Sequence, residues 1–208
     1  DVTYEAGLYL PVGVMGAGVA DVDNDGYMDL YLGVGDPQMS RLEPNRFFHN
    51  NGDGTFTDLT DHVGFHRPGN KGHGVSFVDI DEDGDLDIYA QLGGHYPGDF
   101  ARNAFYKNLK GNQNRWLQVD LVGVKSNRAG IGAQLTVRSG DFLVYREVKG
   151  AEGFGATSQM RQHFGLGART KIDSLEIRWP SGLVQKFDDL SPNQIIRVVE
   201  GDHWTRVK

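Results

Sequence analysis

Two stretches of nine residues carry the side chains of this sequence that are best suited to bind a cation. They read DVDNDGYMD over residues 21–29 and DIDEDGDLD over residues 79–87. Each stretch places a carboxylate at its first, third, fifth and ninth positions and a glycine at its sixth. The glycine allows a sharp turn, so that the first three of these carboxylates face inward. The pattern therefore predicts two loops that each surround a metal ion.

Calcium is the cation that these loops favour. Like charges this close repel one another unless a cation lies between them. Ca²⁺ takes about six to eight oxygen ligands in irregular geometry, whereas Mg²⁺ prefers a rigid octahedron that retains water. An acidic surface turn is the alternative, because Asp, Asn and Gly are common turn residues. The predicted ligands are the carboxylates of Asp21, Asp23, Asp25 and Asp29 with the Tyr27 carbonyl, and those of Asp79, Asp81, Asp83 and Asp87 with the Asp85 carbonyl.

Other classes of site fit the sequence less well. An EF-hand needs a glutamate at its twelfth position, and that position is Leu32 in the first stretch and Ala90 in the second. The chain has no cysteine, no Gly-x-Ser-x-Gly sequence and no His-Glu-x-x-His sequence. A glycosidase needs a carboxylic acid with a raised pKa, whereas acids packed around calcium stay ionised. We therefore expect no catalytic activity, with an enzyme acting on extracellular polysaccharide as a less favoured alternative.

Histidines and aromatic residues have ordinary structural interpretations. His66, His73 and His95 flank the second acidic stretch, so a transition-metal site there is an alternative to polar surface histidines. His163 precedes a Phe-Gly pair and is expected to order a turn. Several aromatic side chains of the second half are expected to pack in a core, with a sugar-binding platform as the alternative. These are Trp116, Phe142, Tyr145, Phe154, Trp179 and Trp204.

The charge of the chain is concentrated in its first half. Residues 1–111 carry a net charge of −11 and residues 112–208 a net charge of +4, which together give the −7 of the chain. Most of the negative charge lies in the two acidic stretches, so it indicates cation sites rather than an acidic surface for partners. The basic residues of the second half are not clustered, and nucleic-acid binding is not expected. No apolar run approaches the roughly 18 residues that span a bilayer.

The two acidic stretches start at Asp21 and Asp79, a spacing of 58, and belong to an internal repeat. Residues 45–50 and 103–108 share an Asn-x-Phe-aromatic-x-Asn pattern at the same spacing, and residues 1–7 echo residues 58–64 at a spacing of 57. A period of this size indicates stacked supersecondary units. Apolar alternation and the Asn-Asn-Gly-Asp-Gly turn at residues 50–54 predict four short antiparallel strands per unit. That is the composition of a β-propeller blade.

The repeat resembles the FG-GAP or VCBS repeat of calcium-binding β-propellers over residues 1–110. The resemblance is carried by Gly18-Val19, by the acidic stretches with the Leu30-Tyr31 and Ile88-Tyr89 pairs that follow them, and by the Asn-x-Phe segments. A propeller closes with about four to eight blades, whereas this sequence holds about two. The opening residues 1–3 look like the last strand of a preceding blade. We therefore expect either a piece of a longer propeller or open edges that another molecule covers.

The second half is expected to form a separate all-β domain without a helix of ten residues. Alternating apolar residues predict strands over residues 115–121, 133–138, 145–148, 175–179, 183–187 and 195–199. Residues 112–201 also resemble the ASPIC/UnbV domain, which follows FG-GAP blades in secreted proteins. The matching segments are 126–128, 131–133, 158–159, 163–167 and 178–182. This resemblance implies an architecture rather than a mechanism.

The sequence thus predicts an all-β fold with a partial β-propeller of about two four-stranded blades over residues 1–111 and a small β-sandwich or barrel over residues 112–208. The expected function is that of a secreted, non-enzymatic, calcium-binding structural or adhesion protein, with two Ca²⁺ sites that staple the blades. Open β edges predict self-association into a homo-oligomer, ring or filament, unless further blades of a longer chain cover them. An extracellular carbohydrate- or matrix-binding module is the alternative.

Overall fold

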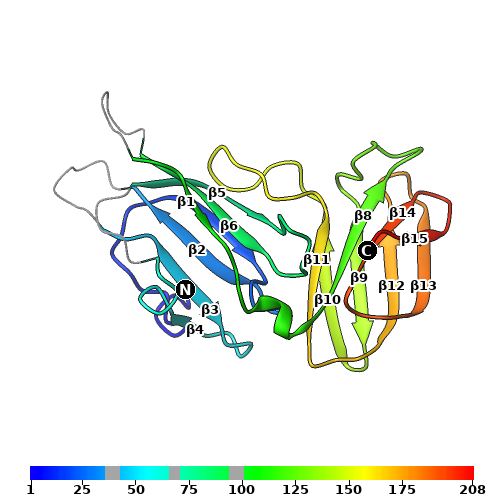
Figure 1. The fold of residues 1–208 in the computed structure, drawn as a ribbon, viewed down its shortest axis with the longest axis horizontal. Helices are drawn as coiled ribbons and strands as arrows, with labels where there is room; N and C mark the ends of the chain where they lie inside the picture. Colours follow the sequence, from blue (N-terminus) through cyan, green and yellow to red (C-terminus); the bar gives the residue numbers. More distant parts are fainter. Residues whose placement is uncertain (36–42, 66–70, 94–100) are drawn as a thin grey trace.

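The computed structural model describes residues 1–35, 43–65, 71–93 and 101–208. Within these ranges nearly all regular structure is β-strand, and the only helix is a single 3-10 turn, η1 (Gly111–Gln113). Figure 1 shows a propeller-like half, residues 1–106, beside a sandwich half, residues 115–206. Among the described residues no helix is long and apolar enough to cross a membrane. The prediction of an all-β fold is confirmed.

Two antiparallel sheets form the propeller-like half. Consecutive strands are neighbours in each sheet, as they are in a propeller blade. The described part of the second unit has three strands, one fewer than the four that were predicted. The first sheet consists of β1 (Val14–Ala20), β2 (Asp29–Val34), β3 (Arg46–Asn50) and β4 (Phe56–Asp58), and the second of β5 (Gly72–Val78), β6 (Asp87–Leu92) and β7 (Ala104–Tyr106).

The two sheets of this half meet where β5 packs against β1 and β2. Glycine makes this close approach possible: a Cβ built on Gly16 would lie 1.8 Å from the His73 carbonyl oxygen. Aromatic residues fill the space between the sheets, and the rings of Phe65 and Tyr106 meet edge to face at 4.5 Å between centroids. The two units therefore stack as neighbouring blades with a shared core.

The internal repeat of the sequence recurs in the hydrogen bonds of the two units. Asn45 Nδ2 donates to the Tyr31 hydroxyl at 2.8 Å. Asn103, at the equivalent position of the second unit, donates to the Tyr89 hydroxyl at 2.7 Å. The Asn-x-Phe segments therefore hold equivalent places in the two sheets, because their side chains tie the third strand of each unit to its second.

The opening residues form a turn, and the prediction of a strand over residues 1–3 is wrong. Thr3 N donates to Asp1 Oδ1 at 3.0 Å, and Thr60 N donates to Asp58 Oδ1 at 2.9 Å. Both turns close on a glycine with positive φ, at residues 7 and 64. The Asp-x-Thr sequence explains the difference, because an aspartate that bonds the amide two residues on favours a turn.

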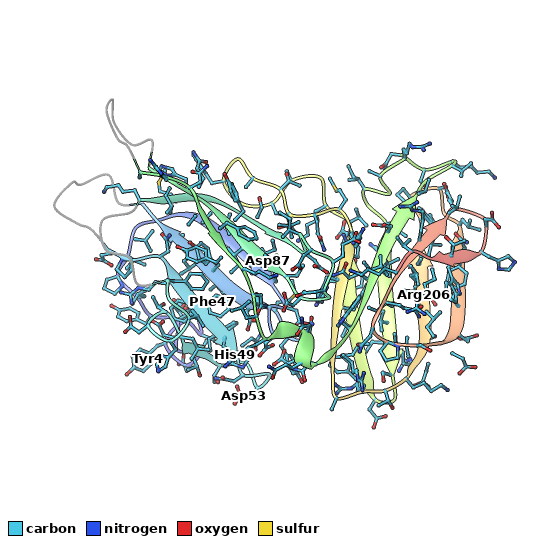
Figure 2. The ribbon with its side chains drawn as sticks, in the orientation of Figure 1. Tyr4, Phe47, His49, Asp53, Asp87 and Arg206 are labelled. Carbon is cyan, nitrogen blue, oxygen red and sulfur yellow. The ribbon has the colours of Figure 1, made fainter. Side chains whose placement is uncertain are left out.

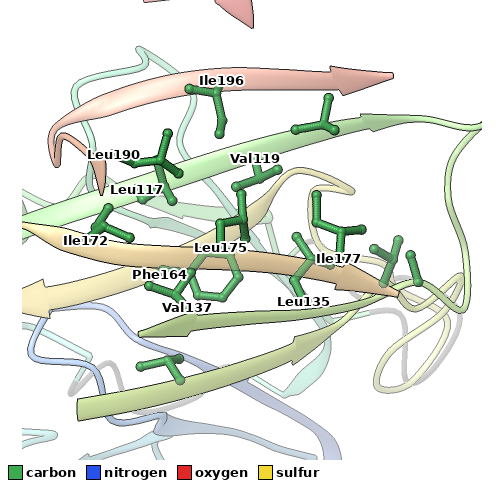
Figure 3. Packing of buried hydrophobic residues seen from close by; sticks show 14 of the residues in the cluster. Leu117, Val119, Leu135, Val137, Phe164, Ile172, Leu175, Ile177, Leu190 and Ile196 are labelled. Carbon is green, nitrogen blue, oxygen red and sulfur yellow. The ribbon is translucent and has the colours of Figure 1, made fainter. Parts of the chain in front are cut away.

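The sandwich half consists of two four-stranded sheets around one apolar core. One of the sheets contains a parallel pair of strands, residues 115–122 and 194–199. The remaining pairs of both sheets are antiparallel. Figure 3 shows side chains of both sheets interleaved between them. The first sheet has the order β11 (Gln162–Gly167), β8 (Arg115–Val122), β14 (Gln194–Val199) and β15 (Trp204–Arg206), and the second the order β10 (Phe142–Glu147), β9 (Gln134–Ser139), β12 (Ile172–Arg178) and β13 (Val184–Leu190).

Strand β11 corrects the prediction that His163 orders a turn. Phe164 and Leu166 point from this strand into the sandwich core, and the alternate residues His163 and Gly165 contact the propeller-like half. The strand is thus buried on both faces, which hides the alternation of apolar and polar residues by which a half-exposed strand is recognised.

Most of the predicted core aromatics are buried, with two exceptions. Tyr145 and Phe154 are 50% and 52% exposed, so the prediction is wrong for these two. Tyr145 lies on β10, an edge strand of its sheet, and Phe154 lies in the loop that follows. The remaining predicted residues are buried or partly buried, and they are Trp116, Phe142, Trp179 and Trp204.

Candidate metal centres

Each acidic loop connects the first two strands of its unit. The first loop, residues 21–28, joins β1 to β2, and the second loop, residues 79–86, joins β5 to β6. The ninth-position acids, Asp29 and Asp87, are already the first residues of β2 and β6. Gly26 and Gly84 have φ values of 102° and 97°, which side chains rarely allow. The strands therefore fix both ends of each loop while the glycine turns its middle.

Backbone amides hold the first acid of each loop in the same orientation. Asp21 Oδ2 accepts a hydrogen bond from Gly26 N at 3.0 Å, and Asp79 Oδ2 accepts one from Gly84 N at 3.0 Å. Hydrogen bonds from backbone N–H groups fix the orientation of a carboxylate. They also favour its charged form, which is the form that binds a cation. The two loops therefore start from equivalent first ligands.

The ninth acids are held in the same manner by the third strands. Asp29 Oδ1 accepts a hydrogen bond from Asn50 N at 2.9 Å, and Asp87 Oδ1 accepts one from Asn108 N at 2.7 Å. The Asn-x-Phe segments thus end opposite the acidic loops in both units, and each positions one predicted ligand.

The structure brings together the first, third and fifth acids of each loop. In both loops one oxygen from each of these acids lies within 4.8 Å of the others. Such convergence suits oxygen ligands of one hard cation. The two groups are Asp21, Asp23 and Asp25, and Asp79, Asp81 and Asp83.

The ninth position differs between the loops. Asp29 forms a further group with Asp23 and His49, whose ligand atoms also lie within 4.8 Å of one another. Asp87 belongs to no such group within the described residues. Figure 2 labels His49 and Asp87 in the propeller-like half. The carbonyls of Tyr27 and Asp85 stay predictions as seventh-position ligands.

Burial raises the pKa of most of the predicted ligands. The pKa of the Asp29 carboxyl rises to about 6, because burial and the neighbouring Asp23 carboxylate both disfavour its charge. The pKa of Asp21 lies well above its ordinary value for the same reasons, with burial the largest cause. In addition, Asp21 Oδ1 is buried with no hydrogen-bond partner among the described residues. A cation at this loop would offset the repulsion and satisfy that oxygen.

Asp85 contributes more than the backbone carbonyl that the sequence suggested. Its side chain is 1% exposed, its Oδ2 accepts a hydrogen bond from Asn112 N at 3.2 Å, and its Oδ1 has no partner within the described chain. Burial and the neighbouring Asp83 raise its pKa to about 7. The excess of acids in the second stretch was the signal in the sequence for an additional buried carboxylate.

The sandwich half closes over both loops. Gly165 N donates to Asp21 Oδ2 at 3.0 Å, and Gln118 Nε2 donates to Asp79 Oδ2 at 2.6 Å. The guanidinium of Arg146 lies 4.0 Å from the same Asp21 oxygen. These contacts were not predicted, because the partners in each hydrogen bond lie far apart in sequence.

Asn24, the fourth residue of the first loop, is fully buried at the junction of the two halves. Its Nδ2 donates to the carbonyl oxygens of Gly84 at 2.8 Å and Gly111 at 3.0 Å, and its Oδ1 contacts His163 Nε2. Its φ of 61° is left-handed, a conformation that asparagine tolerates better than most residues. In the sequence, this role is indicated only by the asparagine at position four. Its contacts across the junction became visible only in the fold.

A chain of polar contacts connects the two loops through the sandwich half. Gln118 Nε2 lies 3.2 Å from His163 Nδ1 and also donates to Asp79. His163 in turn contacts Asn24, which bonds the carbonyl of Gly84 in the second loop. His163 stays neutral, because burial and the nearby Arg146 lower its pKa to about 3.

Position four of the second loop is occupied by a partly exposed acid, Glu82. Glu82 also has a left-handed φ, 56°, and its carboxylate pairs with Arg161 at 3.1 Å. Arg161 Nε donates to Asp120 Oδ1 of β8 at 2.9 Å. At this position the second loop is thus joined to the sandwich half by an ion pair, whereas the first loop is joined by the buried amide of Asn24.

Of the histidines predicted as a possible second metal site, His66 and His95 lie outside the described residues. His73 is part of β5, and its ring lies 6.0 Å from that of Phe154 between centroids. That site stays a prediction.

Each half of the chain contains a segment that matches a family model. Residues 21–90 match the family model described as FG-GAP-like repeat, and residues 123–204 match the model described as ASPIC and UnbV. Both resemblances seen in the sequence are confirmed by these matches.

Among characterised proteins the chain is similar to Cartilage acidic protein 1. The human protein is 34% identical over 88 residues, which is 42% of this chain and 12% of that protein. The mouse protein of the same name is 32% identical over 88 residues, 42% of this chain and 13% of that protein. The matched segment therefore spans only about an eighth of the length of these relatives.

Proposed function

We propose that this chain is a non-enzymatic, calcium-binding structural or adhesion protein of the extracellular space, and that the two acidic loops are its calcium sites. One observation carries the proposal: in both loops the first, third and fifth acids converge at equivalent places in a repeated fold. A simple surface turn needs no such convergence. It also does not explain why Asp21 in the first loop is buried with one oxygen that lacks a partner among the described residues.

Calcium in these loops stabilises the fold rather than switching it. Each loop joins two strands of a blade and touches the sandwich half, so a bound ion ties three elements together. Binding to the folded state alone adds about 2.7 kcal/mol per site when free calcium is at 100 times its dissociation constant. Part of the binding free energy therefore becomes folding free energy.

An extracellular location suits this role, because calcium is abundant outside cells and weaker sites such as extracellular modules are filled there. The FG-GAP-like and ASPIC and UnbV matches and the similarity to Cartilage acidic protein 1 support an adhesion-type protein. We propose no catalytic step for this chain.

Self-association through strand edges belongs to the same proposal. β4 and β7 are the outer strands of their sheets in the described chain, and an unpaired strand edge can pair with another molecule. Head-to-tail pairing would give a ring or a filament, unless further blades of a longer chain occupy the edges. Light scattering with and without calcium tests this part. A strict monomer under both conditions would contradict it.

Thermal unfolding in calcium and in EGTA tests the calcium sites. Two filled sites are expected to raise the melting temperature by about 10 °C or more over the chelated protein, from roughly 2–4 °C per kcal/mol. Asp23→Asn combined with Asp81→Asn replaces the third-position carboxylate of each loop by a neutral amide, which binds calcium more weakly, and should abolish most of that rise. Asp141→Asn, which changes an exposed acid in the turn between β9 and β10, is the matched control. Equal melting curves in calcium and EGTA would refute the proposal.

A further inference from the structure

The two loops differ in the side chain that the third strand presents to them. His49 in the first unit and Lys107 in the second occupy equivalent positions of the repeat, immediately before Asn50 and Asn108. Lys107 Nζ makes an ion pair with Asp81, the third acid of the second loop. His49 instead faces two acids of the first loop. The repeat thus places a possible metal ligand beside one loop and a fixed positive charge beside the other.

The geometry around His49 fits a small metal ion. Its Nδ1 lies 3.1 Å from Asp29 Oδ1 and 3.5 Å from Asp23 Oδ2. In a tetrahedral zinc site with bonds of about 2.0–2.1 Å, neighbouring ligand atoms are about 3.3 Å apart. Two of the three ligand pairs therefore already lie near the spacing that one such ion requires, and the third pair, between Asp23 and Asp29, lies within 4.8 Å.

The surroundings hold these ligands in place and leave a route for an ion. Asp29 is 1% exposed, and its two oxygens accept hydrogen bonds from Val22 N at 3.1 Å and Asn50 N at 2.9 Å. Such outer partners orient a ligating carboxylate. Asp23 and His49 are partly exposed and line a cavity of about 450 Å³ between the two blades. Water can complete the coordination from that side.

The type of ligand decides which ion is favoured. Imidazole nitrogen suits zinc and other late first-row metals, whereas calcium takes oxygen ligands almost exclusively. The second loop offers only oxygen, and there the ammonium group of Lys107 already neutralises Asp81. A nitrogen ligand is thus a feature of the first loop, and a lysine ammonium group paired with the third acid is a feature of the second.

We propose that the first loop, through His49, Asp23 and Asp29, is a site for a divalent transition-metal ion of the zinc class, and that the second loop is not. The inference deepens the proposed function, because it rests on the first loop binding a cation. It assigns the two loops different ions: the first can exchange calcium for zinc, and the second binds calcium only.

Titration of the chelator-stripped full chain with Zn²⁺, by calorimetry and by Co²⁺ absorption in the visible range, tests the proposal. The unaltered chain is expected to bind one Zn²⁺. His49→Gln should weaken that binding at least tenfold and leave the rise in melting temperature with Ca²⁺ in place. His203→Gln, on an exposed histidine, is the matched control and should bind as the unaltered chain does.

The reciprocal variant Lys107→His places imidazole beside the second loop and should add a second Zn²⁺. Folding of each variant is checked by circular dichroism in calcium. Zinc binding that His49→Gln leaves unchanged would overturn the inference, as would its absence from the unaltered chain. If calcium still raises the melting temperature in that case, the proposed function stands alone. If neither ion binds, both fall.

Discussion

Asn24 in the first loop is completely buried, whereas Glu82 at the same position of the second loop is partly exposed and pairs with the partly buried Arg161. Both residues have a left-handed φ, and both loops hold their first and ninth acids with the same backbone amides. The repeat therefore determines the course of the backbone. The side chains at this position differ: the first loop contacts the sandwich half through a buried amide, and the second loop through an ion pair.

The two loops also differ in the positive or neutral groups around their acids. The first has His49 and the buried Arg146 nearby, and the second has Lys107 and Arg161. The two proposed sites would therefore differ in strength and selectivity despite an equivalent backbone. Similar acidic sequences in one chain are consequently poor evidence that their sites are alike.

The largest predicted difference concerns the fourth position. Asn24→Gly keeps the left-handed φ free of strain but leaves the carbonyls of Gly84 and Gly111 and the imidazole of His163 without this partner. We expect a loss of about 3 kcal/mol in the free energy of unfolding. Glu82→Gly removes only a surface ion pair and relieves strain at φ 56°, so its effect should stay within about 1 kcal/mol. Urea unfolding in calcium compares the two, and equal losses would show that the loops are equivalent.

The next effect concerns pH. His163 has a pKa of about 3 in the folded chain, whereas the imidazole of an unfolded chain titrates near 6.5. Below about pH 6.5 the unfolded state therefore binds more protons at this residue, and the contribution of His163 to the free energy of unfolding falls as the pH falls toward 3. At pH 4.5 this loss should reach up to about 3 kcal/mol relative to pH 7.5.

His163→Gln should reduce this dependence on pH, since glutamine does not titrate. Urea unfolding of both proteins at pH 7.5 and 4.5 measures the difference, and the loop acids contribute equally to both. The exposed His203→Gln is the control. An unchanged dependence on pH in His163→Gln would mean that His163 is not held neutral against the first loop.

The smallest effect concerns the second loop. Lys107→Met removes the ammonium group that competes with a cation for Asp81. Calcium affinity at this loop should rise roughly two- to five-fold, since exposed ion pairs are weak. Calorimetric titration with calcium measures it, with Lys186→Met, in an exposed ion pair far from the loops in sequence, as the control. A lower affinity would show that Lys107 supports the site instead of competing with it.

Local patterns in the sequence predicted the parts of the molecule that local chemistry determines. The acidic loops, the internal repeat and most strands follow from alternation, glycine and aspartate within short windows. Residues 1–3, which begin a turn, were mistaken for a strand, although the same Asp-x-Thr sequence at residues 58–60 offered a comparison.

The junction between the halves could not be predicted, because its partners are far apart in sequence. Asp21 meets Gly165 and Asp79 meets Gln118 only after both halves have folded. Strand β11 was missed for the same reason, since its outer face is covered by the first loop. The two stretches that looked equivalent thus acquire different roles from residues that no short window contains.

The matching turns at residues 1–7 and 58–64 lie one repeat apart and delimit a unit of 57 residues. The inner hydrogen bonds recur at nearly the same interval. A copy of residues 1–57 inserted before Asp58 would therefore be flanked on each side by a unit of the same repeat. Lengthening by duplication would therefore repeat these inner contacts, and the number of units could change without redesign of each one. The contacts with the sandwich half are what would distinguish the last copies from the rest.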